Sequence, residues 1–154
     1  MRPPILGIAE VVLNVDDIEK MKSFYQEVIG CTFHSEGCFE EEGADGNTGE
    51  PTIAFLAVNS SETPLAHVGH PPLLVLIDYR RHASSKERFK LINISASTLN
   101  HVAFEINASE FESQRTWLIG HGLKPIEVEF TAMRAKALFV RDPEGNSLEF
   151  ICPI

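Results

Sequence analysis

Three side chains of this sequence have the types and the spacing to bind a divalent metal ion: Glu10, His101 and Glu149. Each lies in a segment that alternates apolar residues with polar or small ones, which is the two-residue period of a β-strand. Carboxylate oxygens and imidazole nitrogens are ligands that suit manganese, iron, nickel and zinc. One histidine with two glutamates leaves coordination positions open for water or a substrate, as Lewis-acid and oxygen chemistry require.

The phase of these strands predicts that the three side chains share one face of a sheet. Successive side chains of a strand point to opposite faces, and the apolar set must face the helix that packs on the sheet. The apolar sets are Val11, Leu13 and Val15 in the first strand, Val102, Phe104 and Ile106 in its later counterpart, and Leu148, Phe150 and Cys152 in the last strand. Glu10, His101 and Glu149 therefore lie on the face turned away from the helices. A glutamate there is as a rule merely solvated, so this alternative stays open.

The elements that position these residues form two similar halves, offset by about 91 residues, the separation of Glu10 and His101. Each half is predicted to contain a strand, a helix and three further strands. The first helix is predicted to begin at Asp16-Asp17-Ile18-Glu19, an N-cap with a glutamate three residues on, and its apolar stripe ends at Gly30. Ser109 with Glu112 forms a capping box for the second helix, in which we expect Trp117 to lie in the core. The later strands are predicted at 31–36, 52–58, 73–79, 124–131, 135–140 and 147–152.

We therefore predict an α+β fold in which two paired βαβββ modules form a curved mixed sheet, a partial barrel with helices on its outer face. The modules cover about residues 5–79 and 99–154, and 80–98 form the linker, so that 1–154 is a single domain. A module of this size cannot easily bury both faces of its sheet alone. The two modules must join edge to edge within one chain or be swapped between two chains.

Composition excludes several classes of protein. The chain has 154 residues, 44% of them hydrophobic, and a net charge of −9, which argues against nucleic-acid or anionic membrane partners. No apolar run approaches the roughly 18 residues of a membrane span, and the N-terminus is too short for a secretory signal. Three irregularly spaced cysteines indicate reduced thiols. We expect a cytoplasmic protein.

Two charged segments fall outside the repeat. The acidic loop, residues 36–50, is expected to be solvated, with a lid over a site as the alternative. The basic segment, residues 80–90 of the linker, is expected to be solvated too, with an anion-binding rim as the alternative. His34 and His121 are expected at the surface, and Tyr79 and Arg134 are candidates for a proton carrier and an anion clamp.

The chain resembles the vicinal oxygen chelate superfamily, which includes glyoxalase I, bleomycin-resistance proteins, fosfomycin-resistance enzymes and extradiol dioxygenases. The resemblance covers nearly the whole chain. The segments that carry it are Val11-Val12-Leu13-Asn14-Val15-Asp16-Asp17, Phe24-Tyr25, Ile29-Gly30, Asn100-His101-Val102-Ala103-Phe104 and Arg141-Asp142-Pro143-Glu144-Gly145-Asn146-Ser147-Leu148-Glu149-Phe150.

The resemblance implies paired βαβββ modules around a metal, with ligands at the start of each module's first strand and near the middle of its last strand. Glu10, His101 and Glu149 match three of these positions. The fourth falls at Leu74 or Leu76, which cannot bind a metal. Two substitutes remain open: Asp78, if the strand slips by two residues, or a histidine that reaches in from the preceding segment. Those histidines are His67 and His70.

The resemblance implies that the chain is a small divalent-metal-dependent enzyme. Its small-molecule substrate would chelate the metal through vicinal oxygens. Isomerase, lyase, epoxide-opening and dioxygenase chemistry all remain open, but glyoxalase I relies on four protein ligands, so an apolar fourth position argues against it. The alternative is a metal-free protein that sequesters a small molecule, as bleomycin-resistance proteins do. A regulatory partner module has only the fold behind it. A homodimer is expected from the same resemblance.

Overall fold

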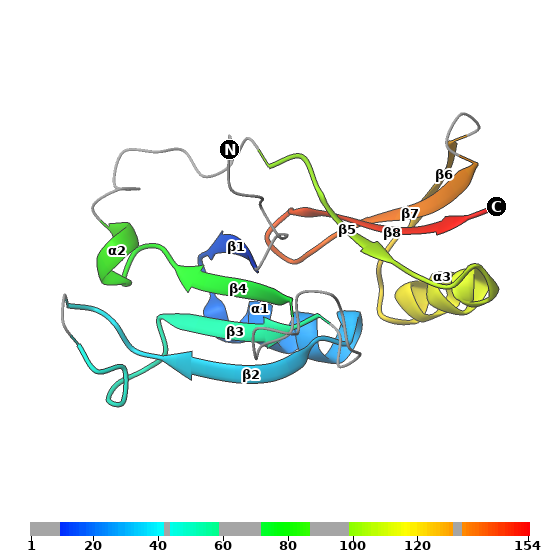
Figure 1. Ribbon diagram of the computed structural model, residues 1–154. Helices are drawn as coiled ribbons and strands as arrows, with labels where there is room; N and C mark the ends of the chain where they lie inside the picture. Colours follow the sequence, from blue (N-terminus) through cyan, green and yellow to red (C-terminus); the bar gives the residue numbers. More distant parts are fainter. Residues whose placement is uncertain (1–9, 42–43, 59–71, 87–98, 131–133) are drawn as a thin grey trace, which may run out of the picture. The chain divides into compact units, whose positions relative to one another are not determined.

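The computed structural model describes residues 10–41, 44–58, 72–86, 99–130 and 134–154 (Figure 1). The chain divides into two compact units, residues 1–95 and 96–154. In both units a strand, a helix and three strands follow one another. The predicted α+β fold of two βαβββ modules is confirmed, with a four-stranded mixed sheet in each module.

The described part of the first unit contains four strands and the helix α1 (Figure 1). Its elements are β1 (Glu10–Val15), α1 (Ile18–Phe24), the π-helical η1 (Tyr25–Ile29), β2 (Thr32–Gly37), β3 (Ile53–Ala57), β4 (Leu73–Asp78) and the short helix α2 (Ala83–Lys86). The strand order is β1-β4-β3-β2, in which β1 runs parallel to β4 and the other pairs are antiparallel.

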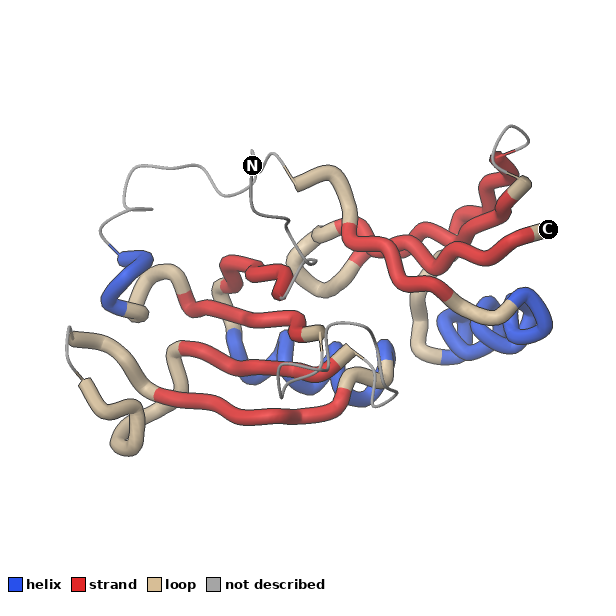
Figure 2. The backbone as a smooth tube through the Cα atoms, in the orientation of Figure 1, coloured by secondary structure: helices blue, strands red, loops and turns tan. Residues whose placement is uncertain are grey.

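The second unit repeats this plan. Its elements are β5 (Val102–Glu105), the 3₁₀ turn η4 (Ala108–Glu110), α3 (Phe111–Gly120), β6 (Ile126–Phe130), β7 (Ala135–Arg141) and β8 (Ser147–Pro153). The order is β5-β8-β7-β6, with β5 parallel to β8. In each unit the long helix covers one face of the sheet (Figure 2). Each predicted strand occurs within a few residues of its predicted bounds.

The two helix starts differ from each other. An N-cap lies in the predicted segment, but at Asp17, one residue after the position that the spacing to Glu19 indicates. The Asp17 carboxylate accepts a hydrogen bond from the backbone N–H of Lys20 at 3.0 Å. Gly30, with φ of +90°, ends the helical segment in the left-handed conformation that glycine adopts at low cost. The capping box at Ser109 is wrong: Ala108–Glu110 form a 3₁₀ turn, and no side chain caps α3.

The sheet of the first unit is apolar on both faces. Its helix face carries Leu13, Val15, Leu74 and Leu76. Ile18, Met21 and Phe24 of α1 and Tyr25 of η1 are buried as well. The alternate residues Ile53, Ala57, Leu73 and Val75 form a buried cluster on the opposite face, and Phe39, Phe55 and Ile77 pack against it. Side chains on both faces of β4 are therefore covered, so its burial is continuous along the strand rather than alternating.

In the second unit α3 buries a narrower stripe than α1. Phe111 and Leu118, seven residues apart, are the buried residues of α3. The prediction that Trp117 lies in the core is wrong, because one residue before Leu118 is a rotation of about 100° around the helix. Trp117 is 49% exposed, and its ring lies 4.1 Å from that of His121.

Two further predictions concern the state of the cysteines and membrane-spanning segments. Cys31, Cys38 and Cys152 are all buried free thiols. Among the residues that the structure describes, no helix has both the length and the apolar character needed to cross a membrane.

Candidate functional site

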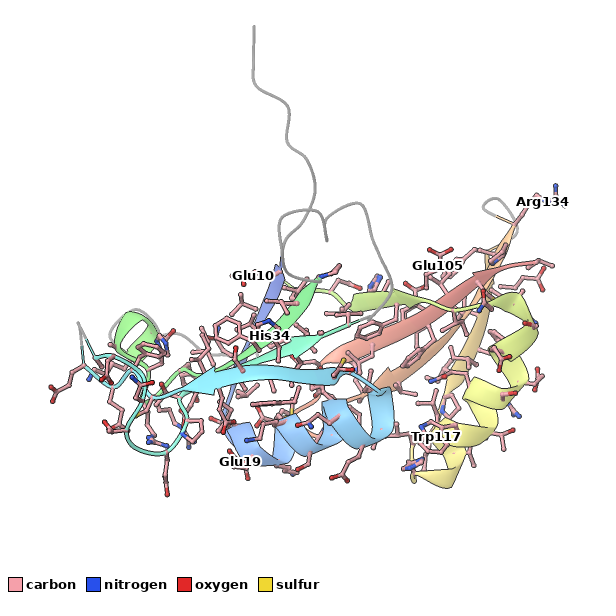
Figure 3. The ribbon with its side chains drawn as sticks, turned by 60° about the horizontal axis from the view of Figure 1, so that its bottom comes forward. Glu10, Glu19, His34, Glu105, Trp117 and Arg134 are labelled. Carbon is pink, nitrogen blue, oxygen red and sulfur yellow. The ribbon has the colours of Figure 1, made fainter. Side chains whose placement is uncertain are left out.

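The structure brings together two of the three predicted ligands, His101 and Glu149. Nε2 of His101 lies 3.1 Å from Oε2 of Glu149. The parallel pairing of β5 with β8 causes this contact: Ala103 lies opposite Glu149, and His101 is two residues before Ala103, so both side chains are on one face. That face is turned away from α3, as Glu105 of the same strand shows in Figure 3.

Glu149 is almost fully buried, whereas His101 lies at the edge of the sheet. Their side chains are 6% and 36% exposed, respectively. An ionised carboxylate in such a place is expensive unless a positive charge or hydrogen-bond donors face it. The pair therefore requires a proton or a cation between the imidazole and the carboxylate.

Asn100 fixes the other side of the imidazole. Its Oδ1 lies 2.7 Å from Nδ1 of His101. An amide oxygen can only accept, so Nδ1 carries the proton in this arrangement. Nε2 then presents either a lone pair or a second proton to Glu149. A hydrogen bond of this kind to a histidine's second nitrogen is a typical support for a metal-binding imidazole.

Phe139 borders the pair, and Phe130 lies beyond it. Phe139 lies directly opposite Glu149 on β7, and its ring is 5.7 Å from that of His101 in an edge-on arrangement. The ring of Phe130 lies 6.5 Å from that of Phe139, again edge-on. The sequence analysis missed both residues and Asn100. Two features of the sequence could have identified Asn100 and Phe139. Asn100 adjoins His101, and the alternation of β7 places Phe139 on the same face as Glu149.

Glu10 begins β1 in the other unit and is exposed. It lies on the side of its sheet away from Glu19 and α1, as predicted (Figure 3). Whether it joins His101 and Glu149 remains a prediction. Within either unit, the described residues include no group of three His, Cys, Asp or Glu side chains that could hold a metal.

The strand registers correct the predicted fourth ligand position. Since Glu10 corresponds to His101, the register of β1 with β4 makes Val75, and not Leu74 or Leu76, the counterpart of Glu149. Val75 is 1% exposed in the apolar cluster of the first unit.

Of the two proposed substitutes for a fourth ligand, only Asp78 falls on described residues. The prediction that Asp78 replaces the fourth ligand through a two-residue slip of the strand is wrong. Asp78 pairs with Val15 and lies on the face of the sheet that packs against the helix. Its carboxylate accepts hydrogen bonds from the backbone N–H and Nε of Arg80. His67 and His70 lie outside the described residues.

The acidic loop and the basic segment pair with each other. Nε of Arg81 lies 2.6 Å from Glu40, and Nη1 of Arg81 lies 3.4 Å from Glu50. The contact with Glu40 raises the pKa of the Arg81 guanidinium. Phe39 anchors the loop in the apolar cluster of the first unit. An anion-binding rim is therefore disfavoured, because carboxylates already occupy the Arg81 guanidinium.

An open pocket of about 640 Å³ beside these residues is also lined mainly by negatively charged groups. Its lining consists of Asp16, Asp17, Ile18, Glu19, Glu50, Pro51, Asp78, Arg80 and Arg81. Carboxylates outnumber guanidiniums there, which again disfavours an anion.

The other predicted polar candidates have contacts of their own or are exposed. The Tyr79 hydroxyl bonds to the Asp16 carboxylate, which raises its pKa and ties it to the first unit. Arg134 is exposed at the start of β7 with a φ of +51°. His34 and His121 are exposed, as predicted.

Comparisons with known proteins identify the family and the fold. A family model described as the Glyoxalase/Bleomycin resistance protein/Dioxygenase superfamily matches residues 7–150. No curated protein matches the sequence significantly.

Several solved structures share the fold. FosX, a fosfomycin resistance protein from Listeria monocytogenes complexed with Mn(II) and sulfate, is 13% identical with a TM-score of 0.63, over 98% of this chain and 93% of that one. Lactoylglutathione lyase from Agrobacterium tumefaciens is 18% identical with a TM-score of 0.62, over 96% and 94%. TnmS3, an antibiotic binding protein from a Streptomyces species, is 17% identical with a TM-score of 0.60, over 99% and 100%.

Proposed function

The chain belongs to the Glyoxalase/Bleomycin resistance protein/Dioxygenase superfamily, and on this premise we propose that it is a divalent-metal-dependent enzyme. Its substrate is a small molecule that offers two adjacent oxygens to the metal. One observation carries the proposal: the buried carboxylate of Glu149 faces Nε2 of His101 at 3.1 Å.

The residues present fit a metal ion. Two ligand atoms that each lie about 2.1 Å from one ion, at right angles to each other, are about 3.0 Å apart. The separation of Nε2 and Oε2 agrees with this value. His101 and Glu149 would hold the ion, with Glu10 as the third protein ligand. This set favours manganese, iron, nickel or zinc, and FosX of the same fold binds Mn(II).

The chain's own residues prepare the site for such chemistry. A divalent cation, when bound, stabilises negative charge on a substrate oxygen as a Lewis acid. Asn100 keeps the proton on Nδ1 of His101 and leaves Nε2 free to bind. Phe139 shields one side of the imidazole from water. The reaction belongs to the isomerase, lyase, epoxide-opening or dioxygenase classes. Homodimerisation, a cytoplasmic location and the absence of nucleic-acid partners remain predictions.

A metal-free binding protein is the second candidate. The observation in its favour is Val75, an apolar residue at the counterpart of Glu149. TnmS3, an antibiotic binding protein, shares the fold. The His101–Glu149 pair argues against this candidate, because a binder of apolar molecules does not need a buried carboxylate beside an imidazole.

The experiment that tests the proposal is metal analysis of the untagged full chain after growth with manganese, iron, nickel and zinc. We expect nearly one metal ion per chain in the wild type and almost none in the His101→Ala/Glu149→Ala double variant. The matched control is Glu105→Ala with His121→Ala, which removes an exposed glutamate and an exposed histidine of the same unit. This control should keep its metal.

Two single variants sharpen the test. Asn100→Ala should lower the affinity for the metal about tenfold, since it removes only the support of the imidazole. Glu10→Gln should lower it further if Glu10 is the third ligand. A wild type without metal would contradict the proposed enzyme and favour the binding protein. A double variant that retains its metal would contradict the assignment of His101 and Glu149 as ligands.

A further inference from the structure

We propose that Phe130 and Phe139 form a subsite for a flat, uncharged group of the ligand, next to the atoms that chelate the metal. This inference rests on the proposed function, because it places the ligand's oxygens at the His101–Glu149 pair. It adds the chemical class of the rest of the ligand: an aromatic or similarly flat apolar body, rather than an anionic one.

The strand register puts both rings on the face that carries the metal pair. Phe139 lies opposite Glu149, and Phe130 lies opposite Ala135, on the same side of the sheet. Both phenylalanines are half-buried. The aromatic surface therefore continues from the imidazole of His101 across β7 to β6.

The two rings lean toward each other. Ala135, the partner of Phe130, and Phe139 are four residues apart on β7, which separates their backbones by about 13 Å. Their ring centroids are nevertheless 6.5 Å apart. The residue between them on this face is Ala137, which is fully buried and small enough to lie beneath the rings. The result is an apolar surface made of two edge-on rings, against which a flat group can pack edge-on or offset-stacked.

The charges on this face disfavour an anion. Among the strand positions that the structure describes on this face of the second unit, Arg141 is the only lysine or arginine. Its Nη1 donates a hydrogen bond to the carbonyl of Gly145 at 2.9 Å. Glu105 and Glu149 add negative charge to the same face. A phosphonate or carboxylate on the ligand body would meet repulsion there, whereas an uncharged ring would not.

The test uses two probes with the same chelating head, acetohydroxamate and benzohydroxamate, which present two adjacent oxygens and differ in a methyl or a phenyl group. Their dissociation constants are measured by calorimetry on the manganese-loaded full chain. We expect benzohydroxamate to bind the wild type about tenfold more tightly, since the phenyl group packs on the two rings. Benzohydroxamate with a carboxylate para to the head should bind more weakly than benzohydroxamate itself.

Variants assign the preference to these rings. Phe130→Leu lies away from the metal pair and should reduce the preference for the phenyl probe at least about threefold, with the manganese affinity unchanged. Phe104→Leu is the matched control, because Phe104 stacks on Phe150 at 5.6 Å on the opposite face. It should retain the full preference.

The two proposals fail in different ways. Manganese-loaded protein that binds both probes equally, or a Phe130→Leu variant with the wild-type preference, would overturn the subsite and leave the metal site standing. A chain that binds no divalent metal would overturn the proposed function, and the subsite with it.

Discussion

The two units have the same strand order and the same parallel pair, yet the faces turned away from their helices differ in kind. In the first unit this face holds a buried apolar cluster around Val75. In the second it holds Glu149, the partner of His101. At the two corresponding positions the first unit has Val75 for Glu149 and Glu10 for His101.

The difference shows what a buried carboxylate requires. Glu149 is tolerated because an imidazole supported by Asn100 faces it. A carboxylate at position 75 would lie near Glu10 instead, and two like charges would repel each other. One backbone plan thus gives an apolar sheet face in one unit and a polar site in the other, according to the residue at the first-strand position.

Val75→Glu tests whether the first unit's sheet face can accept a buried carboxylate, and it is expected to have the largest effect. This change buries a carboxylate without a partner and should lower the free energy of unfolding by about 4 kcal/mol. Val12→Glu is the matched control, because Val12 pairs with Val75 across β1 and β4 and is 44% exposed. The control should cost less than about 1 kcal/mol. Urea denaturation followed by circular dichroism measures both values.

Equal stability of Val75→Glu and the wild type would contradict the comparison. It would mean that the first unit also supplies a positive charge to this face. Metal analysis of the variant would then show whether position 75 had become a ligand.

A second comparison concerns the two helices. Met21 of α1 is fully buried, so Met21→Ala should lower the free energy of unfolding by about 3 kcal/mol. Trp117→Ala in α3 removes a larger side chain, but one that is 49% exposed, and should cost less than about 1 kcal/mol. The same urea titration measures both. A larger loss for Trp117→Ala would show that the outer face of α3 is covered in the folded protein.

The smallest of these effects depends on pH. Burial raises the pKa of the Cys31 thiol to about 11, from an ordinary value of 9.0. Since the folded state holds this proton more tightly, the associated stability is complete below pH 9 and is lost as the pH rises toward 11. The expected loss is about 2 kcal/mol.

Cys31→Ala provides the control for this pH dependence. Its free energy of unfolding should fall less between pH 8.5 and 10.5 than that of the wild type, after allowance for any constant difference between the two proteins. Parallel curves for the two proteins would show that the thiol ionises equally in the folded and unfolded states.

Much of the fold could be predicted from local patterns. Period-two alternation, an N-cap within Asp16-Asp17 and the turn glycine Gly30 depend on neighbouring residues, and the structure confirms them, with the cap at Asp17. The exposed Trp117 and the 3₁₀ turn at Ala108–Glu110 were missed. Both depend on which side of α3 packs on the sheet, and a short helix with a weak apolar stripe does not specify this.

The sequence by itself determined the two-module plan and the face on which His101 and Glu149 lie, because the direction of a side chain along a strand follows from covalent geometry. Only the tertiary structure decided that these side chains lie 3.1 Å apart, that Glu149 is buried, and that Asn100 and Phe139 adjoin His101, with Phe130 next to Phe139. It also made Val75 the counterpart of Glu149. These features depend on the register between strands distant in the sequence, which the hydrogen bonds and packing of the whole sheet select.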